Sequence, residues 1–129
     1  LSFILKLMLD DLKYIHEKDA QDALGIAEKQ WQQLEQVYDL GDWKLESDSV
    51  QNIVFGGMGG SALAALISIS WPAYSVPFEI SRDYEIPAYV SNKTLFIASS
   101  YSGNTEETIA ALQAAKSKGA IIAVIASGG

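Results

Sequence analysis

The stretch TLFIASSYSGNTEETIAALQAAKSKGAIIAVIA, residues 94–126, decides the fold class of this chain. Its apolar start at 94–99 and its apolar end at 121–126 each predict a short buried strand. The segment 105–119 between them predicts a helix, with lysines in the last turn and Gly119 just past the end. Strands that alternate with helices in this way indicate a parallel sheet covered by helices on both faces.

The alternation extends toward the N-terminus. NIVFG (52–56) and VPFEI (76–80) predict two further strands, and SALAALISIS (61–70) predicts the helix between them. The segment 49–129 is therefore expected to be an α/β core, a three-layer parallel sheet of the Rossmann-like type. The chain stops just after the strand at 121–126, where another strand–helix unit is expected, so we interpret the core as C-terminally incomplete.

Residues 1–48 predict a helical lead in front of this core. Apolar residues there recur at alternating spacings of three and four, which places them on one face of a helix. A shorter stripe of the same kind precedes it and predicts an earlier helix. The longer stripe consists of Leu24, Ala27, Trp31, Leu34 and Tyr38, and the shorter one of Leu5, Met8, Leu12 and Ile15.

Composition narrows the functional classes. With 129 residues, 49% of them hydrophobic and 19% charged, the chain is expected to form one globular domain. The net charge is −7 and the cations form no cluster, which argues against nucleic-acid binding. No apolar run approaches the roughly 20 residues of a membrane span, and no signal peptide is evident. The absence of cysteine excludes disulfides and fits a reducing compartment, so we expect a cytoplasmic protein with no membrane partner.

The turn at 100–105, here called the serine turn, joins the third predicted strand to its helix. Ser100, Ser102 and Thr105 supply hydroxyl groups around Gly103, and the turn contains no Lys or Arg. The first N–H groups of a helix have no partner within it, and the helix dipole places about half a positive charge there. These donors together favour an anion such as a phosphate monoester, with no cation required. Ordinary N-capping by Asn104 or Thr105 is the alternative, and it leaves the other hydroxyls and the glycine unexplained.

The segment GGMGGSA (56–62), here called the glycine turn, follows the first predicted strand. Its pattern G-x-G-x-x-A at 57–62, with Glu79 about 20 residues later at the end of the next strand candidate, matches a dinucleotide-binding fingerprint. The same glycines would let a smaller ligand approach closely, with Ser61 at the helix start, or would serve only a tight turn. A ligand that bridged the glycine turn and the serine turn would use both.

Four segments resemble, in their order and spacing, a known family, the sugar isomerase (SIS) domain. They are GMGGSALAALI, SRDYEIP, TLFIASSYSGNTEET and GAIIAVIASGG, and they are most similar to the first such domain of bifunctional phosphoglucose/phosphomannose isomerases. MLDDLKYI (8–15) is also similar to the start of those proteins, so the resemblance covers roughly residues 8–129. It implies a five-stranded parallel sheet of the SIS type, and a homodimer whose chains carry a second SIS domain that is missing here.

The resemblance also implies a reaction, the reversible isomerisation of glucose 6-phosphate or mannose 6-phosphate to fructose 6-phosphate. It implies a sugar phosphate as the small-molecule partner, with no metal and no organic cofactor. It assigns no catalytic residue here, because the base, the histidine and the arginine of similar proteins lie beyond the SGG segment at 127–129, so the chain alone is expected to be inactive. The implied binding residues are Ser100, Ser102 and Thr105, with Gly103 between them, on the phosphate side, and Gly59, Gly60 and Ser61 on the sugar side.

Other polar residues have simpler explanations. His16, the only histidine, lies in the acidic helical lead and is interpreted as a surface or packing residue. The glutamates at 106–107 are interpreted as favourable first-turn residues rather than bases. Arg82 follows the second predicted strand and is a candidate minor substrate contact, although an ion pair with Asp83 or Glu85 explains it more simply.

Two functions of other classes stay open. A regulatory SIS domain that senses sugar phosphates would use the same two turns and would differ in the module to which it is attached. A dinucleotide-binding domain would use the glycine turn and would leave the hydroxyl-rich serine turn unexplained.

Overall fold

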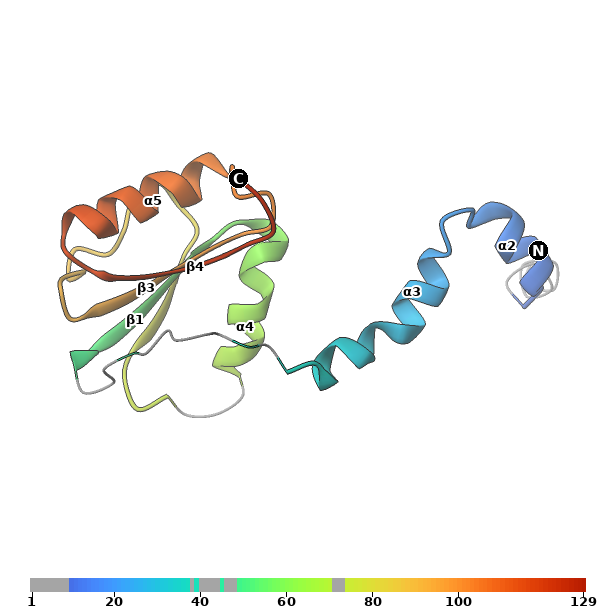
Figure 1. Ribbon diagram of the computed structural model, residues 1–129, viewed down its shortest axis with the longest axis horizontal. Helices are drawn as coiled ribbons and strands as arrows, with labels where there is room; N and C mark the ends of the chain where they lie inside the picture. The colour runs from blue at the N-terminus through green and yellow to red at the C-terminus, as the bar shows by residue number, and fades with distance from the viewer. Residues whose placement is uncertain (1–9, 38, 40–44, 46–48, 71–73) are drawn as a thin grey trace, which may run out of the picture. The chain divides into compact units, whose positions relative to one another are not determined.

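The computed structural model divides the chain into two units, Leu1–Trp43 and Lys44–Gly129, which are described one at a time. We refer to them as the N-terminal unit and the C-terminal unit (Figure 1). The structure describes residues 10–37, 39, 45, 49–70 and 74–129.

The N-terminal unit is helical, as the sequence predicts. It contains α2 (Leu12–Lys18), α3 (Ala23–Lys29) and the 3₁₀ helix η1 (Gln30–Glu35). Asp11 caps α2, because its carboxylate accepts hydrogen bonds from the backbone N–H groups of the second and third residues after it, at 3.0 and 3.3 Å. Asp19 ends the same helix, and hydrogen bonds from the backbone N–H groups of Leu24 and Ala23 lower the pKa of its carboxyl group.

The prediction of one continuous α-helix through the longer apolar stripe is wrong. The α-helical part ends at Lys29, and the chain continues as a 3₁₀ helix. A 3₁₀ helix has three residues per turn, so the spacing of three and four no longer keeps the apolar residues on one face. Within the N-terminal unit taken by itself, Leu24, Trp31 and Leu34 are all exposed. Leu5, Met8 and Tyr38 lie outside the described residues.

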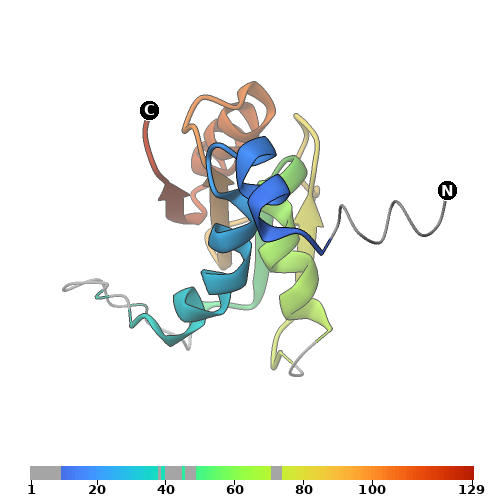
Figure 2. The same cartoon turned by 90° about the vertical axis from the view of Figure 1, so that its right-hand side faces the viewer.

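The C-terminal unit is built on a parallel sheet of four strands, and this confirms the predicted α/β class. The order is β2-β1-β3-β4, so the chain builds the sheet outward from β1 in both directions. Figure 2 shows the strands side by side, from the red β4 at one edge to the yellow β2 at the other. The described residues contribute four strands, where the resemblance implies five for the complete sheet. The strands are β1 (Asn52–Gly57), β2 (Phe78–Ser81), β3 (Thr94–Ser100) and β4 (Ile121–Ala126).

Helices cover both faces of this sheet and give the three predicted layers. A 3₁₀ turn, η3 (Gly59–Ala62), leads from β1 into α4 (Leu63–Ile69), and α5 (Glu106–Ser117) follows β3. The connections from β1 to β2 and from β3 to β4 run in opposite directions across the sheet, so right-handed crossovers place their helices on opposite faces. Figure 1 shows α4 and α5 on the two sides of the strands.

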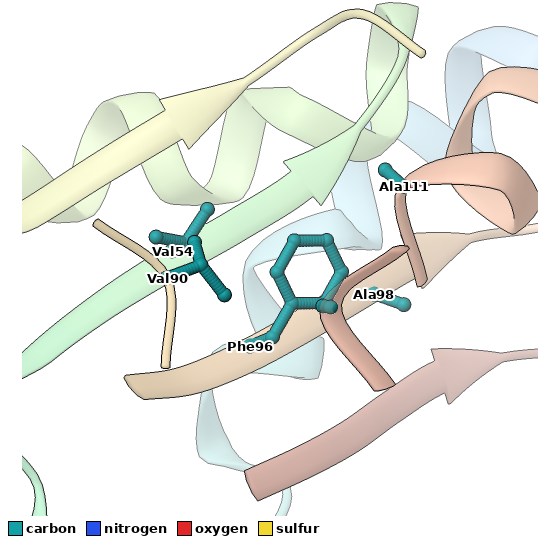
Figure 3. Packing of buried hydrophobic residues seen from close by; sticks show 6 residues of the cluster. Val54, Val90, Phe96, Ala98 and Ala111 are labelled. Carbon is teal, nitrogen blue, oxygen red and sulfur yellow. The ribbon is translucent and has the colours of Figure 1, made fainter. Parts of the chain in front are cut away.

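The main core lies between the sheet and α5 (Figure 3). Val54 and Phe96 are fully buried there, packed against Ala111 of α5 and Val90 of the loop before β3. The Phe96 ring lies across β1 at Gly56, where an added Cβ would come within 2.7 Å of Cζ. Glycine at this position therefore lets the largest core side chain fit, and burial of such a ring contributes roughly 2–3 kcal/mol.

Candidate functional site

The two predicted turns lie at the same edge of the sheet. The glycine turn follows β1 and the serine turn follows β3, and these two strands are direct neighbours with Gly57 paired to Ser99. The connections leave in opposite directions at this point, because β1 leads toward β2 and β3 leads toward β4. Ligands of open parallel sheets bind at such a reversal, beyond the carboxyl ends of the strands.

The serine turn is closed by its own hydroxyl groups. The Ser100 hydroxyl, 5% exposed, lies 2.8 Å from the Thr105 hydroxyl and accepts a hydrogen bond from the Gly103 N–H at 3.1 Å. The Ser102 hydroxyl accepts from the Asn104 N–H at 3.3 Å. A hydroxyl that accepts still has its own proton to donate. The hydrogen bonds that close the turn therefore leave two hydroxyl protons available to a ligand, that of Ser102 and that of one member of the Ser100–Thr105 pair.

Gly103 is required by the shape of the serine turn. Its φ is +72°, in the region that favours glycine, and an added Cβ would overlap the backbone of Gly128. The Ser127 N–H donates to the Tyr101 carbonyl at 3.1 Å, so the chain after β4 lies directly against this turn.

The start of α5 is not capped in the ordinary way. Thr105 has the extended backbone of an N-cap residue, but its side chain makes no capping hydrogen bond and pairs with Ser100 instead. The Asn104 side-chain amide donates to the Ser102 carbonyl at 3.2 Å and so belongs to the turn. Side-chain capping by Asn104 or Thr105 is therefore not observed, and the first N–H groups of α5 keep their capacity to bind an acceptor.

The glycines of the glycine turn that follow Gly56 are required for different physical reasons. An added Cβ at Gly57 would lie 3.0 Å from the Ser99 carbonyl oxygen, so close packing explains it. Gly59 has a φ of +50°, so the turn itself explains it. Gly60 has neither constraint, and an added Cβ at Gly59 or Gly60 would meet nothing within 4 Å. The surface above these two exposed residues is therefore open to a ligand.

Ser61 connects the two turns. Its hydroxyl accepts from the Tyr101 N–H at 3.3 Å, and its carbonyl accepts from the Ser99 hydroxyl at 3.2 Å. The structure thus brings together the residues predicted to bind the phosphate and those predicted to bind the sugar. These residues lie on two adjacent turns and are Gly59, Gly60, Ser61, Ser100, Ser102, Gly103 and Thr105.

Arg82 lies apart from this hydrogen-bonded set. It follows β2 directly and is exposed. No ion pair between Arg82 and Asp83 or Glu85 is observed among the described residues, so that pairing stays a prediction. Its place just after β2 puts it at the same edge of the sheet as the two turns, and its role as a minor substrate contact stays a prediction.

Glu79 does not occupy the position that a ribose-binding acid needs. It is the second residue of β2, paired with Val54, and the strand continues to Ser81, so it does not lie at the strand end as the fingerprint requires. The Tyr89 hydroxyl donates to its carboxylate at 2.6 Å. Desolvation, together with this hydrogen bond and the carboxylate charge, raises the pKa of Tyr89 to about 12.

Three residues near the turns were not among the predicted binding residues. Ser99 and Tyr101 hold Ser61, and a strict two-residue alternation along β3 would have shown that Ser99 faces away from Ser100. Thr108, in the first turn of α5, is 5% exposed, and its hydroxyl has no hydrogen-bond partner in the described structure. Its spacing of three from Thr105 was the available signal.

Cofactor and membrane features are not found within the described ranges. No group of three or more His, Cys, Asp or Glu side chains there is arranged to hold a metal ion. None of the helices described combines the length and the apolar character that a membrane crossing requires.

A family model and several known proteins match this chain over more than half of its length. Residues 48–129 match the family model of the SIS domain. The chain is 43% identical over 103 residues, 76% of its length, to a protein of Caldicellulosiruptor bescii named bifunctional phosphoglucose/phosphomannose isomerase. Proteins of the same name from Thermoplasma acidophilum and Thermoplasma volcanium are 46% and 51% identical, over 68% and 60% of this chain. The chain spans only 30%, 28% and 25% of the lengths of these three relatives. No solved structure matches it.

Proposed function

Because this chain belongs to the SIS domain family, we propose that its C-terminal unit binds a sugar phosphate across the serine turn and the glycine turn. The observation that supports this most is the start of α5. Its N-cap side chain is turned to Ser100, while the hydroxyls of Ser102 and of the Ser100–Thr105 pair have protons to donate. A phosphate monoester presents three acceptor oxygens and a charge of about −1.5 to −2, which matches a helix start surrounded by hydroxyl donors.

The glycine turn would hold the sugar. Gly59 and Gly60 leave open space above the backbone, so a hexose can approach it closely. The Ser61 hydroxyl accepts from the Tyr101 N–H, which directs its own proton away from the protein backbone and toward a ligand oxygen. Arg82 is proposed as a minor contact at the same edge of the sheet.

We propose that the protein containing this domain interconverts glucose 6-phosphate or mannose 6-phosphate with fructose 6-phosphate, as the names of the relatives suggest. The reaction opens the sugar ring and moves a proton between adjacent carbons through an enediol, so it needs a base with a tuned pKa and donors for the developing charge. The contribution of this domain is to fix the phosphate and thereby the position of the reacting carbons.

No residue of this chain is proposed as catalytic. We place the base, the histidine and the arginine of the reaction beyond Gly129, in keeping with relatives that are more than three times as long as the matched segment. We further propose a cytoplasmic homodimer with a second SIS domain in each chain, residues 1–129 forming one SIS-type unit with its helical lead, and no metal or organic cofactor.

The alternatives differ in their support. A sugar-phosphate sensor would use the same binding residues, and measurement of turnover by the longer protein separates it from the enzyme. A dinucleotide site is disfavoured by Glu79, which lies within β2 and is held by Tyr89. NAD is nevertheless the right competitor for the binding experiment.

The binding proposal is tested by titrating ¹⁵N-labelled residues 1–129 with glucose 6-phosphate and with NAD, since NMR detects weak binding. Ser100→Ala and Ser102→Ala should each weaken glucose 6-phosphate binding by about tenfold or more, because a hydrogen bond to a charged group contributes about 1.5–3 kcal/mol. Ser117→Ala is the matched control, since its hydroxyl donates to the Ala114 carbonyl at the far end of α5. Equal binding by all three variants, or perturbation of the glycine turn by NAD alone, would contradict the proposal.

A further inference from the structure

We infer that Ser99 is a positioning residue for sugar-phosphate binding, one that fixes the glycine turn relative to the serine turn without touching the ligand. The inference deepens the proposed function and rests on it. It starts from the observation that the Ser99 hydroxyl donates to the Ser61 carbonyl at 3.2 Å, a contact between residues 38 apart in the sequence.

The direction of the Ser99 side chain separates it from the binding residues. Side chains alternate along a strand, so Ser99 and Ser100 point to opposite faces of the sheet. Ser100 lies on the face covered by α5 and takes part in the serine turn. Ser99 lies on the other face, at the entrance to α4, and is 8% exposed. Its hydroxyl serves the protein backbone.

The glycine turn is held at its two ends, where Gly57 pairs with β3 and Ala62 is fully buried, but packing does not hold its middle. The backbone pairing of β1 with β3 ends at Gly57 and Ser99. Beyond Gly57, the two following glycines have open space where a side chain would be, and the Ser61 N–H bonds only within the turn, to the Met58 carbonyl at 3.0 Å. Packing at Gly59 and Gly60 therefore cannot determine where the Ser61 hydroxyl lies.

Two hydrogen bonds from β3 and the serine turn position Ser61, one through its backbone carbonyl and one through its side-chain hydroxyl. Ser99 holds the carbonyl, and the Tyr101 N–H holds the hydroxyl at 3.3 Å. Without the Ser99 hydroxyl, Ser61 would keep only one of these two hydrogen bonds, the one that its own hydroxyl accepts from the Tyr101 N–H. That bond is the longer of the two. The glycine turn would then vary in position relative to the serine turn, while the hydrogen bonds within the serine turn would be unchanged.

This arrangement predicts a selective effect. A ligand held by the serine turn alone, such as inorganic phosphate, does not depend on where Ser61 lies. A ligand that spans both turns, such as glucose 6-phosphate, requires both turns in one fixed arrangement. Ser99 should therefore affect the difference between the two affinities, which a general role in folding would not change.

The test is an NMR titration of ¹⁵N-labelled residues 1–129 with inorganic phosphate and, separately, with glucose 6-phosphate. For Ser99→Ala we expect the dissociation constant of inorganic phosphate to stay within about twofold and that of glucose 6-phosphate to rise about five- to tenfold, the loss typical of one neutral hydrogen bond. Ser68→Ala is the matched control, because its hydroxyl donates to the Ala65 carbonyl within α4 at 2.8 Å. It should change neither constant.

The other outcomes are decisive as well. Equal weakening of both ligands, or no weakening of either, would overturn the inference. Failure of the unsubstituted chain to bind either ligand would instead contradict the proposed function. If Ser99→Ala does not fold, Ser99→Thr and Ser99→Val carry the comparison, since they share one shape and differ in the hydroxyl. The threonine variant should retain the preference for glucose 6-phosphate, and equal behaviour of the pair would refute the inference.

Discussion

Replacement of Thr108 with Val should stabilise the C-terminal unit, although most substitutions in a buried region destabilise a protein. The Thr108 side chain is 5% exposed, and its hydroxyl oxygen has no hydrogen-bond partner in the described structure. A buried hydroxyl without a partner costs about 1–3 kcal/mol. Valine keeps the β-branched shape and replaces the hydroxyl with a methyl group, so it removes this cost and adds apolar contact.

The expected gain is about 1–2 kcal/mol in the free energy of unfolding, or an increase in Tm of about 3–8 °C for a unit of this size. Thr94, the first residue of β3, provides a matched control in the same unit. It is buried, as Thr108 is, but its hydroxyl accepts a hydrogen bond from the Ser91 N–H at 3.0 Å. Thr94→Val makes the same chemical change and leaves that N–H without its acceptor, so it should destabilise by about 1–2 kcal/mol.

Urea unfolding followed by circular dichroism measures both variants, with an unchanged slope showing that each unfolds as the unsubstituted chain does. The sign of the difference is the result that matters, because both substitutions conserve volume. If Thr108→Val destabilises by 1 kcal/mol or more, as Thr94→Val does, then the Thr108 hydroxyl has a partner in solution. The description of this group as unsatisfied would then be wrong.

Two further predictions concern backbone conformation and pH. Gly103→Ala should destabilise the chain by more than Gly119→Ala, because both residues have positive φ, which costs alanine about 1–2 kcal/mol, but only the Cβ at position 103 would overlap a neighbouring backbone, that of Gly128. Equal losses in thermal unfolding would show that this overlap is relieved by a small shift. Tyr89 has a folded pKa of about 12 against an ordinary value of 10.0, so the unfolded chain loses this proton first, and stability that is present below pH 10 should fall as the pH rises toward 12. The phenol is about half exposed, so we expect a loss of about 1 kcal/mol after solvent screening, and Tyr89→Phe should remove this component of the alkaline decline in urea unfolding.

The fold was largely predictable because its strands are short and apolar and are separated along the chain by helical or turn-forming segments. Each of the four predicted strands is present, and the predicted helix at 105–119 is α5 with slightly later start and earlier end. The helical lead was less predictable in detail. Its stripe indicates a helix correctly, but spacing alone cannot distinguish an α-helix from a 3₁₀ continuation when the side chains of the stripe are exposed.

The candidate site divides into a predictable half and an unpredictable half. The serine turn is local, since its hydrogen bonds join residues two to five apart, so residue types and their order were enough to indicate it. The roles within it were less certain, because Thr105 could either cap α5 or pair with Ser100, and the choice depends on a side-chain rotation that the sequence does not encode by spacing. The predicted strand at 76–80 ends one residue early, and Glu79 lies two residues before the observed end at Ser81, so the dinucleotide pattern looked stronger than the structure supports.

The hydrogen bonds that link the serine turn to the glycine turn could not be predicted from the sequence of either turn. The contacts from Ser99 and Tyr101 to Ser61 join residues 38 and 40 apart, and they exist only because β1 and β3 are neighbours in one register. A register slip of one residue would turn Ser99 to the face of α5 and Ser100 away from it, so the sheet determines which serine supports the site and which one forms it. The serine turn can therefore bind an anion as an isolated local structure, whereas discrimination of a sugar phosphate from phosphate depends on the correct pairing of the whole sheet. For this reason a substitution that loosens the pairing of β1 with β3 should reduce sugar selectivity before it abolishes anion binding.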